Sequence, residues 1–513
     1  MPDEPQIRGR LLARNTSLNL LGQAIPLLVG LGTIPYVVRG LGTVQFGVLS
    51  IAWVLLGYFS LFDLGLGRAT TKFVAECLGR MEIEKLPRLV WTSLGIQILF
   101  GLAGALIAAA ATPLLVEKVL KIPPDLVHDT RVCLFLLAAS LPVVLVANGL
   151  RGVLEAAQRF DLVNYVKVPI NVSIFLLPAV AIPFGAGLPG IVLLLVLVRL
   201  GAILGYLILC LKVFPILGQR CSLNFELFRP LLSYGGWITV SNLVSPIFTY
   251  VDRFFIGALL SMAAVSYYTA PYEAITRAGM ILPGSLIATL FPAFSSLDAG
   301  AAKERIGDFY VRSVKLLLLL LGPPMLLVVV FGRAFLLFWL GADFADKSSL
   351  TLQILAMGVL VNALAVVPFG LLQGVGRPDV TAKFHLVELP VYAGMVWILI
   401  GRMGISGAAL AWTLRVTLDA LLLFGACRWF NLVSLRALSE KGLLRSVLVV
   451  AGFGLASFLT LLSHVTLTTQ AVLVAGMLPF VGLGIWNFAL DSSDRSLLVS
   501  ATSHLVTKVG GAK

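Results

Sequence analysis

Eight charged residues lie away from the ends of apolar stretches of this sequence or next to such a residue, where charged side chains are rare. Four are arginines and four are acids: Arg199, Arg253, Arg277 and Arg415, and Asp252, Glu273, Glu388 and Asp419. An ionised side chain at the centre of a membrane-spanning helix costs about 2.5 to 3.5 kcal/mol on the insertion scale, so such residues usually face a cavity or a partner. Because guanidinium binds phosphates and carboxylates through paired hydrogen bonds, the arginines predict an anion-binding cleft. The acids are candidate counter-charges or ion-coupling carboxylates.

The spacing of some of these charges fits a second interpretation. Glu273 and Arg277 stand four residues apart, as do Arg415 and Asp419, and this is the spacing of an ion pair within one helix. Arg253 has a long side chain that could extend to an aqueous interface. Both interpretations stay open on the sequence alone.

Arg199 differs from the other three arginines, because its own apolar stretch contains no acid. A lone guanidinium in such a place is hard to explain unless an anion visits it. The sequence therefore favours Arg199 as an anion-binding residue.

The elements that must position these residues are membrane-spanning helices. Of the 513 residues, 59% are hydrophobic and only 12% are charged, against about 25% charged in an average soluble domain. A bilayer-crossing helix needs about 20 apolar residues. The apolar runs predict an all-α polytopic membrane protein with about fourteen such helices, at 15–37, 44–66, 89–111, 131–150, 169–185, 188–211, 232–257, 262–292, 313–332, 350–372, 385–401, 405–426, 446–463 and 470–490. This composition excludes a soluble enzyme, a secreted disulfide scaffold and a disordered chain.

The net charge of +13 is explained mainly by membrane topology. If the N- and C-termini are cytoplasmic, 27 of the 38 lysines and arginines fall in cytoplasmic segments. Basic residues collect on the cytoplasmic side of membrane proteins, so this excess supports the orientation and does not indicate nucleic-acid binding.

An internal repeat divides the predicted helices into two sets. Gly187–Arg199 and Gly404–Arg415 each have Gly-x-x-Gly, an apolar run and a final arginine, and Gln158–Pro169 resembles Gly376–Pro390 at a similar offset. Copies with an even number of spans form parallel repeats, as in some transporters. We therefore predict two pseudo-symmetric six-helix lobes, over 1–212 and 231–426, joined by a cytoplasmic linker over 213–230. Two additional helices and a cytoplasmic tail follow over 427–513.

The sequence contains no motif for catalysis or for a cofactor. It has no Gly-Lys dipeptide, which a phosphate-binding P-loop requires, no His-Glu-x-x-His zinc motif and no Gly-x-Ser-x-Gly nucleophile motif. We predict no catalytic residue, no metal ligand and no bound cofactor, and a protein that is not an enzyme.

Several short motifs resemble a known family. The stretch that begins at Asn19 contains Gly-x-x-x-Phe-Gly at Gly42–Gly47 and then Asp-Leu-Gly-Leu-Gly at Asp63–Gly67, and a second stretch reads VDRFFIGALLSMAAVSYYTAPYEA from Val251. These resemble the polysaccharide-biosynthesis transporters, which are the oligosaccharide or O-antigen flippases of the multidrug/oligosaccharidyl-lipid/polysaccharide exporter superfamily.

The resemblance implies a function and a location. Such proteins move undecaprenyl-diphosphate-linked sugar units across the bacterial inner membrane by alternating access, often driven by a proton or sodium gradient. The substrate would be a lipid-linked oligosaccharide, and the partners would be membrane lipids and other polysaccharide-assembly proteins. Two alternatives remain: a cation-coupled multidrug exporter of the same superfamily, and a polytopic glycosyltransferase or polymerase, which the short predicted outer loops disfavour.

Overall fold

The fold is built from helices. The computed structural model describes residues 4–58, 65–219, 224, 248–295, 303–433, 442–463, 466–491 and 494–495, and this part of the chain contains no strand. Its α-helices are α1 (Glu4–Tyr58), α2 (Leu66–Gly79), α3 (Leu86–Leu114), α4 (Val127–Ala139), α5 (Leu141–Ala156), α6 (Phe160–Ala181), α7 (Leu188–Val213), α8 (Ile216–Gln219), α10 (Met262–Ser295), α11 (Lys303–Leu340), α12 (Ala342–Gly374), α13 (Pro378–Met403), α14 (Ile405–Trp429), α16 (Leu443–Leu462) and α17 (Leu467–Gly484). Residues 248–259 are also helical. The prediction of an all-α fold is confirmed.

Eleven helices of the described residues are long and apolar enough to cross a membrane. The chain is therefore a multi-pass membrane protein. The first predicted span and residues 44–58 of the second lie within α1, where 24–56 is counted as one candidate span, and 59–64 of the second lie outside the described residues. The eighth predicted span lies in α10, which is not among the eleven, and 232–247 of the seventh span lie outside the described residues. The total of fourteen spans stays a prediction.

Gly42 separates the two halves of α1. Its backbone has φ 78° and ψ 163°, which is not helical, so α1 is two helices that meet at a sharp kink. A positive φ is readily adopted only by glycine. The break lies between the first two predicted spans, which end and begin at 37 and 44.

The helices pack into two compact units. The first unit comprises Met1–Ala278 and His385–Ala411, and the second comprises Gly279–Phe384 and Trp412–Lys513. This division follows packing and does not test the predicted boundaries of the lobes and the two added helices. Those boundaries stay a prediction, and 220–223 and 225–230 of the predicted linker lie outside the described residues.

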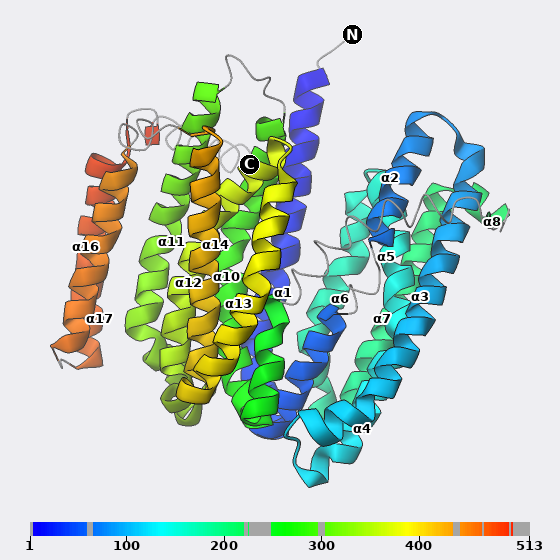
Figure 1. The fold of residues 1–513 in the computed structure, drawn as a ribbon, viewed down its shortest axis with the longest axis horizontal. Helices are drawn as coiled ribbons and strands as arrows, with labels where there is room; N and C mark the ends of the chain where they lie inside the picture. Colours follow the sequence, from blue (N-terminus) through cyan, green and yellow to red (C-terminus); the bar gives the residue numbers. More distant parts are fainter. Residues whose placement is uncertain are drawn as a thin grey trace, which may run out of the picture. The chain divides into compact units, whose positions relative to one another are not determined.

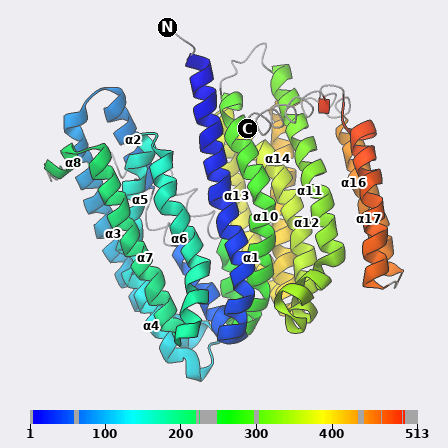
Figure 2. The ribbon, with the colours of Figure 1, turned by 180° about the vertical axis from the view of Figure 1, so that it is seen from behind.

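In the first unit, α5 packs between α2, α3 and α7, and α6 packs against α1 and α7. The helices α3, α5 and α7 lie side by side in both views of the ribbon (Figures 1 and 2). Buried apolar residues such as Leu86, Leu150 and Val153 form the core between them. This packing fixes α7, which carries Arg199.

In the second unit, α11 packs against α12 and α16, and α16 packs against α17. A buried ion pair joins α11 to the last described residues. The Lys315 ammonium is paired with Asp494, and Arg312 Nε lies 2.8 Å from the other oxygen of that carboxylate. The segment after α17 is thereby attached to α11.

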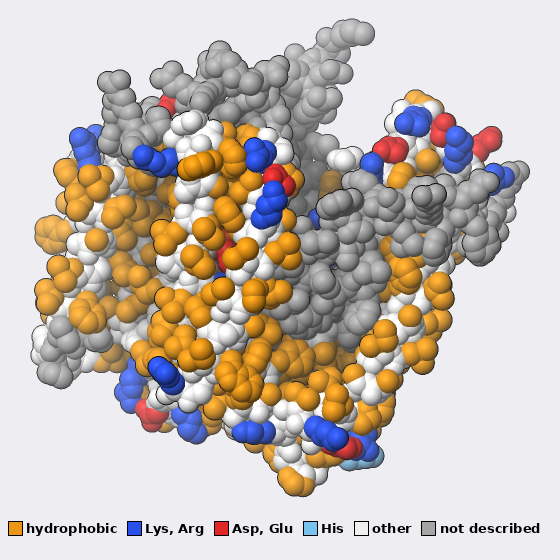
Figure 3. All heavy atoms as spheres, viewed as in Figure 1, with side chains coloured by type: hydrophobic (Ala, Val, Ile, Leu, Met, Phe, Trp, Pro, Cys, Tyr) orange, Lys and Arg blue, Asp and Glu red, His pale blue; other side chains and the backbone are white. Residues whose placement is uncertain are grey.

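Large apolar side chains cover much of the outer surface of the helices. Leu106 of α3, Trp397 of α13 and Phe480 of α17 are more than half exposed. On the face drawn in Figure 3, hydrophobic side chains cover the sides of the helices, and charged side chains gather at the helix ends. A surface of this kind is stable in the hydrocarbon core of a bilayer.

Corresponding positions of the predicted repeat have the same local structure in each unit. In the first unit, Arg159 Nη2 lies 3.0 Å from Asp161 Oδ2 at the start of α6. In the second unit, Arg377 Nε lies 3.2 Å from Asp379 Oδ1 at the start of α13. The Arg-x-Asp motif therefore closes the same short turn before each helix.

Two cysteines repeat in the same way. The Cys210 thiol of α7 lies 3.3 Å from the carbonyl oxygen of Leu150, and the Cys427 thiol of α14 lies 3.7 Å from that of Pro368. Both contacts join helices that occupy equivalent places in the two copies. These recurrences support a duplication of the six-helix set.

Candidate functional site

A cavity of about 150 Å³ in the first unit brings together three of the four predicted arginines. Five helical segments supply its walls: Ser50, Trp53, Val54 and Leu56 of α1, Ile174 of α6, Arg199 of α7, Tyr250 and Arg253 of 248–259, and Thr269, Glu273 and Arg277 of α10. We call this the arginine cavity. Its volume is about that of five water molecules, so a small polar group fits inside it.

Arg253 is fully buried and held by several neighbours. Its Nη1 donates to the carbonyl oxygen of Thr249 at 2.6 Å, and its Nη2 donates to Glu273 Oε1 at 2.9 Å. The guanidinium lies 4.2 Å from the centre of the Tyr272 ring, and Asp252 Oδ1 lies 3.6 Å from Nη1. This buried position does not fit a side chain that extends to an aqueous interface. Arg253 gives the cavity a fixed positive charge.

Glu273 also binds Arg277. Arg277 Nε donates to Glu273 Oε2 at 2.6 Å, so the ion pair predicted from the four-residue spacing is confirmed. The Arg277 guanidinium lies 5.1 Å from the centre of the Phe175 ring, an attractive cation–π geometry. Its side chain is 47% exposed, which leaves room for it to reorient toward a ligand.

Arg199 lies on the α7 wall of the cavity. Its side chain is half-buried, and among the described residues it forms no ion pair within 4 Å. This agrees with the absence of an acid from its own stretch of sequence. A guanidinium in this position can give all of its donors to a ligand.

The charges on the cavity wall favour an anion. Arg199, Arg253 and Arg277 supply three positive charges, while Glu273 on the wall and Asp252 directly behind it supply two negative charges, which leaves an excess of one positive charge. The rest of the wall is apolar and has a low dielectric constant, so the electrostatic field of this excess charge is focused into the cavity and is weakly screened. This excess of positive charge favours an anion over a cation.

Asp252 is buried behind the cavity wall and is not part of it. Its carboxylate accepts hydrogen bonds from the Tyr268 hydroxyl and, at 2.7 Å, from the backbone N–H of Arg253. The Tyr268 and Tyr272 rings stack on each other with centroids 5.6 Å apart. Asp252 thus has the place of a counter-charge next to Arg253.

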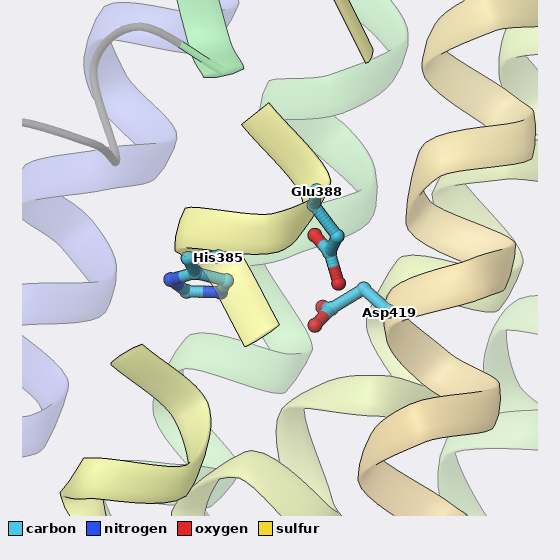
Figure 4. Close-up of side chains that lie close together, drawn as sticks. All are labelled: His385, Glu388 and Asp419. Atoms are coloured by element: carbon cyan, nitrogen blue, oxygen red, sulfur yellow. The ribbon is translucent and has the colours of Figure 1, made fainter. Parts of the chain in front are cut away.

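Like Asp252, three further predicted site residues do not line the arginine cavity: Glu388, Arg415 and Asp419. Glu388 belongs to the first unit, where it is buried on α13 three residues after His385 (Figure 4). Arg415 and Asp419 belong to α14 in the second unit, and both are more than 90% buried. Their assignment to substrate binding or ion coupling stays a prediction.

The sequence analysis missed four residues of this site: Trp53, Tyr250, Thr269 and Phe175. The first three line the cavity, and Phe175 lies under Arg277. In the sequence they are ordinary members of apolar or mixed helices, because aromatic and hydroxyl side chains are common in membrane spans. No spacing signal distinguishes them.

Comparison with solved structures identifies the fold. The fold resembles that of the lipid II flippase MurJ in an inward closed conformation, with a TM-score of 0.66, 12% identity, and coverage of 92% of this chain and 98% of that one. It also resembles a multidrug resistance MATE family transporter in an inward-facing conformation, with a TM-score of 0.67, 15% identity, and coverage of 82% and 96%. At such identities the similarity establishes the fold alone.

Sequence comparison identifies the family. The model of the family described as "Polysaccharide biosynthesis protein" matches residues 12–298, a range that contains every residue of the arginine cavity. A Shigella flexneri protein described as "Putative O-antigen transporter" is 31% identical over 413 residues, which are 80% of this chain and 96% of that protein. The chain belongs to the polysaccharide biosynthesis protein family, as its short motifs predicted.

Proposed function

We propose that this protein is a flippase that moves undecaprenyl-diphosphate-linked sugar units across a membrane by alternating access, for the synthesis of a surface polysaccharide. The family membership and the relative described as an O-antigen transporter support this class of substrate. The observation that carries the proposal is the arginine cavity, where three guanidinium groups outnumber the carboxylates of Glu273 on the wall and Asp252 behind it.

The diphosphate is the part of the substrate that fits this charge. A diphosphate carries at least two negative charges, and planar guanidinium groups bind phosphate oxygens in pairs. Arg199 offers donors that no acid occupies, and Arg277 can exchange its bond to Glu273 for a bond to phosphate. The lipid tail remains in the bilayer while phosphate oxygens of the head group reach the arginines of the cavity.

The location and the energy source are part of the same proposal. The distribution of lysine and arginine supports cytoplasmic termini, and the class of substrate supports the bacterial inner membrane. The buried acids Asp252 and Glu388 are candidate sites for coupling to a proton or sodium gradient. Imposing a proton or a sodium gradient on proteoliposomes and measuring the rate of lipid translocation tests each ion separately.

The two alternatives have less support. A multidrug exporter with cationic cargo needs exposed carboxylates, whereas the arginine cavity has an excess of positive charge. The similarity to a MATE transporter is one of fold alone. A glycosyltransferase or polymerase is disfavoured because the relative that covers most of the chain is described as a transporter.

Replacing Arg199 tests the proposal directly. Because Arg199 has no acidic partner among the described residues, Arg199→Gln leaves no buried carboxylate uncompensated, and we expect normal folding. Loss of charge-assisted hydrogen bonds worth about 1.5 to 3 kcal/mol should weaken binding of undecaprenyl diphosphate at least about tenfold. It should also reduce surface polysaccharide.

Arg333→Gln is the matched control, since Arg333 forms an exposed ion pair with Asp346 and does not line the cavity. Arg199→Lys should retain part of the binding. Normal polysaccharide export by Arg199→Gln, at normal protein level, would show that the cavity does not bind the head group.

A further inference from the structure

We infer that one polar face of α6 holds the sugars of the substrate while phosphate oxygens of the same molecule reach the arginine cavity. This face carries Asn164, Lys167 and Asn171, which we call the α6 stripe. The inference rests on the proposed function, and it assigns a place to the part of the head group that the arginines do not bind.

The arginine cavity is too small for the whole head group. Its volume of about 150 Å³ is about that of five water molecules, so phosphate oxygens reach the arginines but sugar rings do not fit beside them. The sugars then lie outside the cavity, on a surface that is continuous with it. Such a surface has to offer hydrogen-bond donors and acceptors, because a sugar carries several hydroxyl groups.

The α6 stripe is continuous with the cavity. Ile174 of α6 lines the cavity, and the three residues of the stripe precede it by three, seven and ten positions. Residues at this spacing share one face of a helix. Seven residues correspond to about 10 Å along the helix axis. The stripe therefore extends from the cavity to Lys167 and beyond, toward the end of α6 that is predicted to be cytoplasmic.

The face of α6 that points to lipid is a different one. The large apolar side chains that α6 exposes are Tyr165, Leu176 and Val180. With 3.6 residues per turn, all three fall on the side of the helix opposite Ile174. Lys167 follows the direction of Ile174, so it lies on the side of α6 away from these exposed apolar residues.

The face of Ile174 is closed at both ends and open at Lys167. Val163 and Ala181, which share this face by their spacing, are each 4% exposed. Lys167 lies between them in the sequence, and its side chain is exposed. The inward face of α6 is therefore accessible at Lys167, where a ligand that extends out of the cavity can reach it.

The chemistry of the stripe matches a sugar. Within the described residues, Lys167 forms no ion pair within 4 Å and the Asn171 amide makes no hydrogen bond. The ammonium offers three donors, and the amide offers two donors and an acceptor. Sugar hydroxyls donate and accept, so they can use both groups, and the ammonium can also pair with the carboxylate of an acidic sugar.

The test compares two probes in equilibrium binding to the purified full-length protein. One is undecaprenyl diphosphate, and the other is undecaprenyl diphosphate that carries two N-acetylglucosamine units, which the wild type should bind more tightly. Lys167→Met and Asn171→Leu remove the polar groups and retain most of the side-chain volume. Since loss of one hydrogen bond changes affinity by about two- to tenfold, we expect each variant to bind the sugar-bearing probe more weakly by that factor and the bare diphosphate normally.

Two controls match these substitutions away from the stripe. Lys85→Met removes an ammonium that forms an exposed pair with Glu82 at 2.9 Å, outside α6. Ser173→Ala removes a hydroxyl of α6 itself, which donates to the carbonyl oxygen of Pro169 at 2.7 Å. Neither control should change the ratio of the two affinities.

Three results would overturn the place of the sugars on α6. Equal weakening of both probes by Lys167→Met would make Lys167 a phosphate ligand. Unchanged binding of both probes would leave Lys167 the role of a basic residue that fixes membrane topology. A wild type that binds the two probes equally tightly would show that the sugars make no contact. A wild type that binds neither probe would instead overturn the proposed function.

Discussion

Glu273 sets the charge balance of the arginine cavity, so its neutralisation is the most informative perturbation. Its two carboxylate oxygens bind Arg253 at 2.9 Å and Arg277 at 2.6 Å. It is the acid among the lining residues. Glu273→Gln keeps the shape of the side chain and removes the charge, so the wall changes from three positive charges and one negative charge to three positive charges.

Two effects of opposite sign follow from this change. A negative charge about 7 Å from a bound anionic group raises its energy by roughly 2 kcal/mol at an effective dielectric constant of about 20. Removing that charge should therefore tighten diphosphate binding by roughly tenfold or more. The protein itself loses charge-assisted hydrogen bonds worth about 1.5 to 3 kcal/mol, although Asp252, at 3.6 Å, still neutralises part of the Arg253 charge.

Equilibrium binding of undecaprenyl diphosphate and the midpoint of thermal unfolding in detergent measure the two effects separately. We expect Glu273→Gln to bind more tightly, to unfold at a lower temperature, and to export less polysaccharide because release is slower. Glu155→Gln is the control, since it makes the same charge change in a half-buried pair with Arg151 that does not line the cavity. If folded Glu273→Gln bound the diphosphate as weakly as the wild type, Glu273 would not compete with the ligand for the arginines.

Two further predictions concern stability. Gly47→Ala should unfold at a lower temperature than the wild type, because its Cβ would lie 1.9 Å from the carbonyl oxygen of Met262. Gly32→Ala, in open space on the part of α1 before the kink, should raise the free energy of unfolding by up to about 1 kcal/mol. Equal unfolding midpoints for the two variants would contradict the close packing at Gly47. Asp494→Asn should lower the free energy of unfolding by about 3 kcal/mol, because it leaves the buried Lys315 ammonium without its main partner. If the variant unfolded at the same temperature as the wild type, this pair would not hold the C-terminal segment.

The helices themselves could be predicted from the sequence, because apolar runs of spanning length leave few alternatives in a bilayer. The break between the first two spans appears as the kink at Gly42. The ion pair between Glu273 and Arg277 follows from helical spacing, since residues four apart lie on one face. What these predictions share is that each depends on one helix and its immediate surroundings.

The membership of the cavity could not be predicted in the same way. Whether Arg199 of α7 and Arg253 of 248–259 line the same space depends on how each helix is rotated about its axis, and the apolar faces of a membrane helix do not specify this rotation. Trp53 and Thr269 carry no charge, so nothing in their surroundings marks them.

The repeat adds an argument about which arginine binds the anion. Arg199 and Arg415 occupy equivalent positions in the two copies, but the residue four positions later is Ile203 in one copy and Asp419 in the other. Ile203 packs against the apolar core of the first unit, so the field of Arg199 is opposed by no acid on its own helix. Arg415 has an acid at ion-pair spacing. The difference between Ile203 and Asp419 therefore leaves a larger net positive charge around Arg199 than around Arg415. The arginine with the stronger attraction for an anion is the one that lines the cavity.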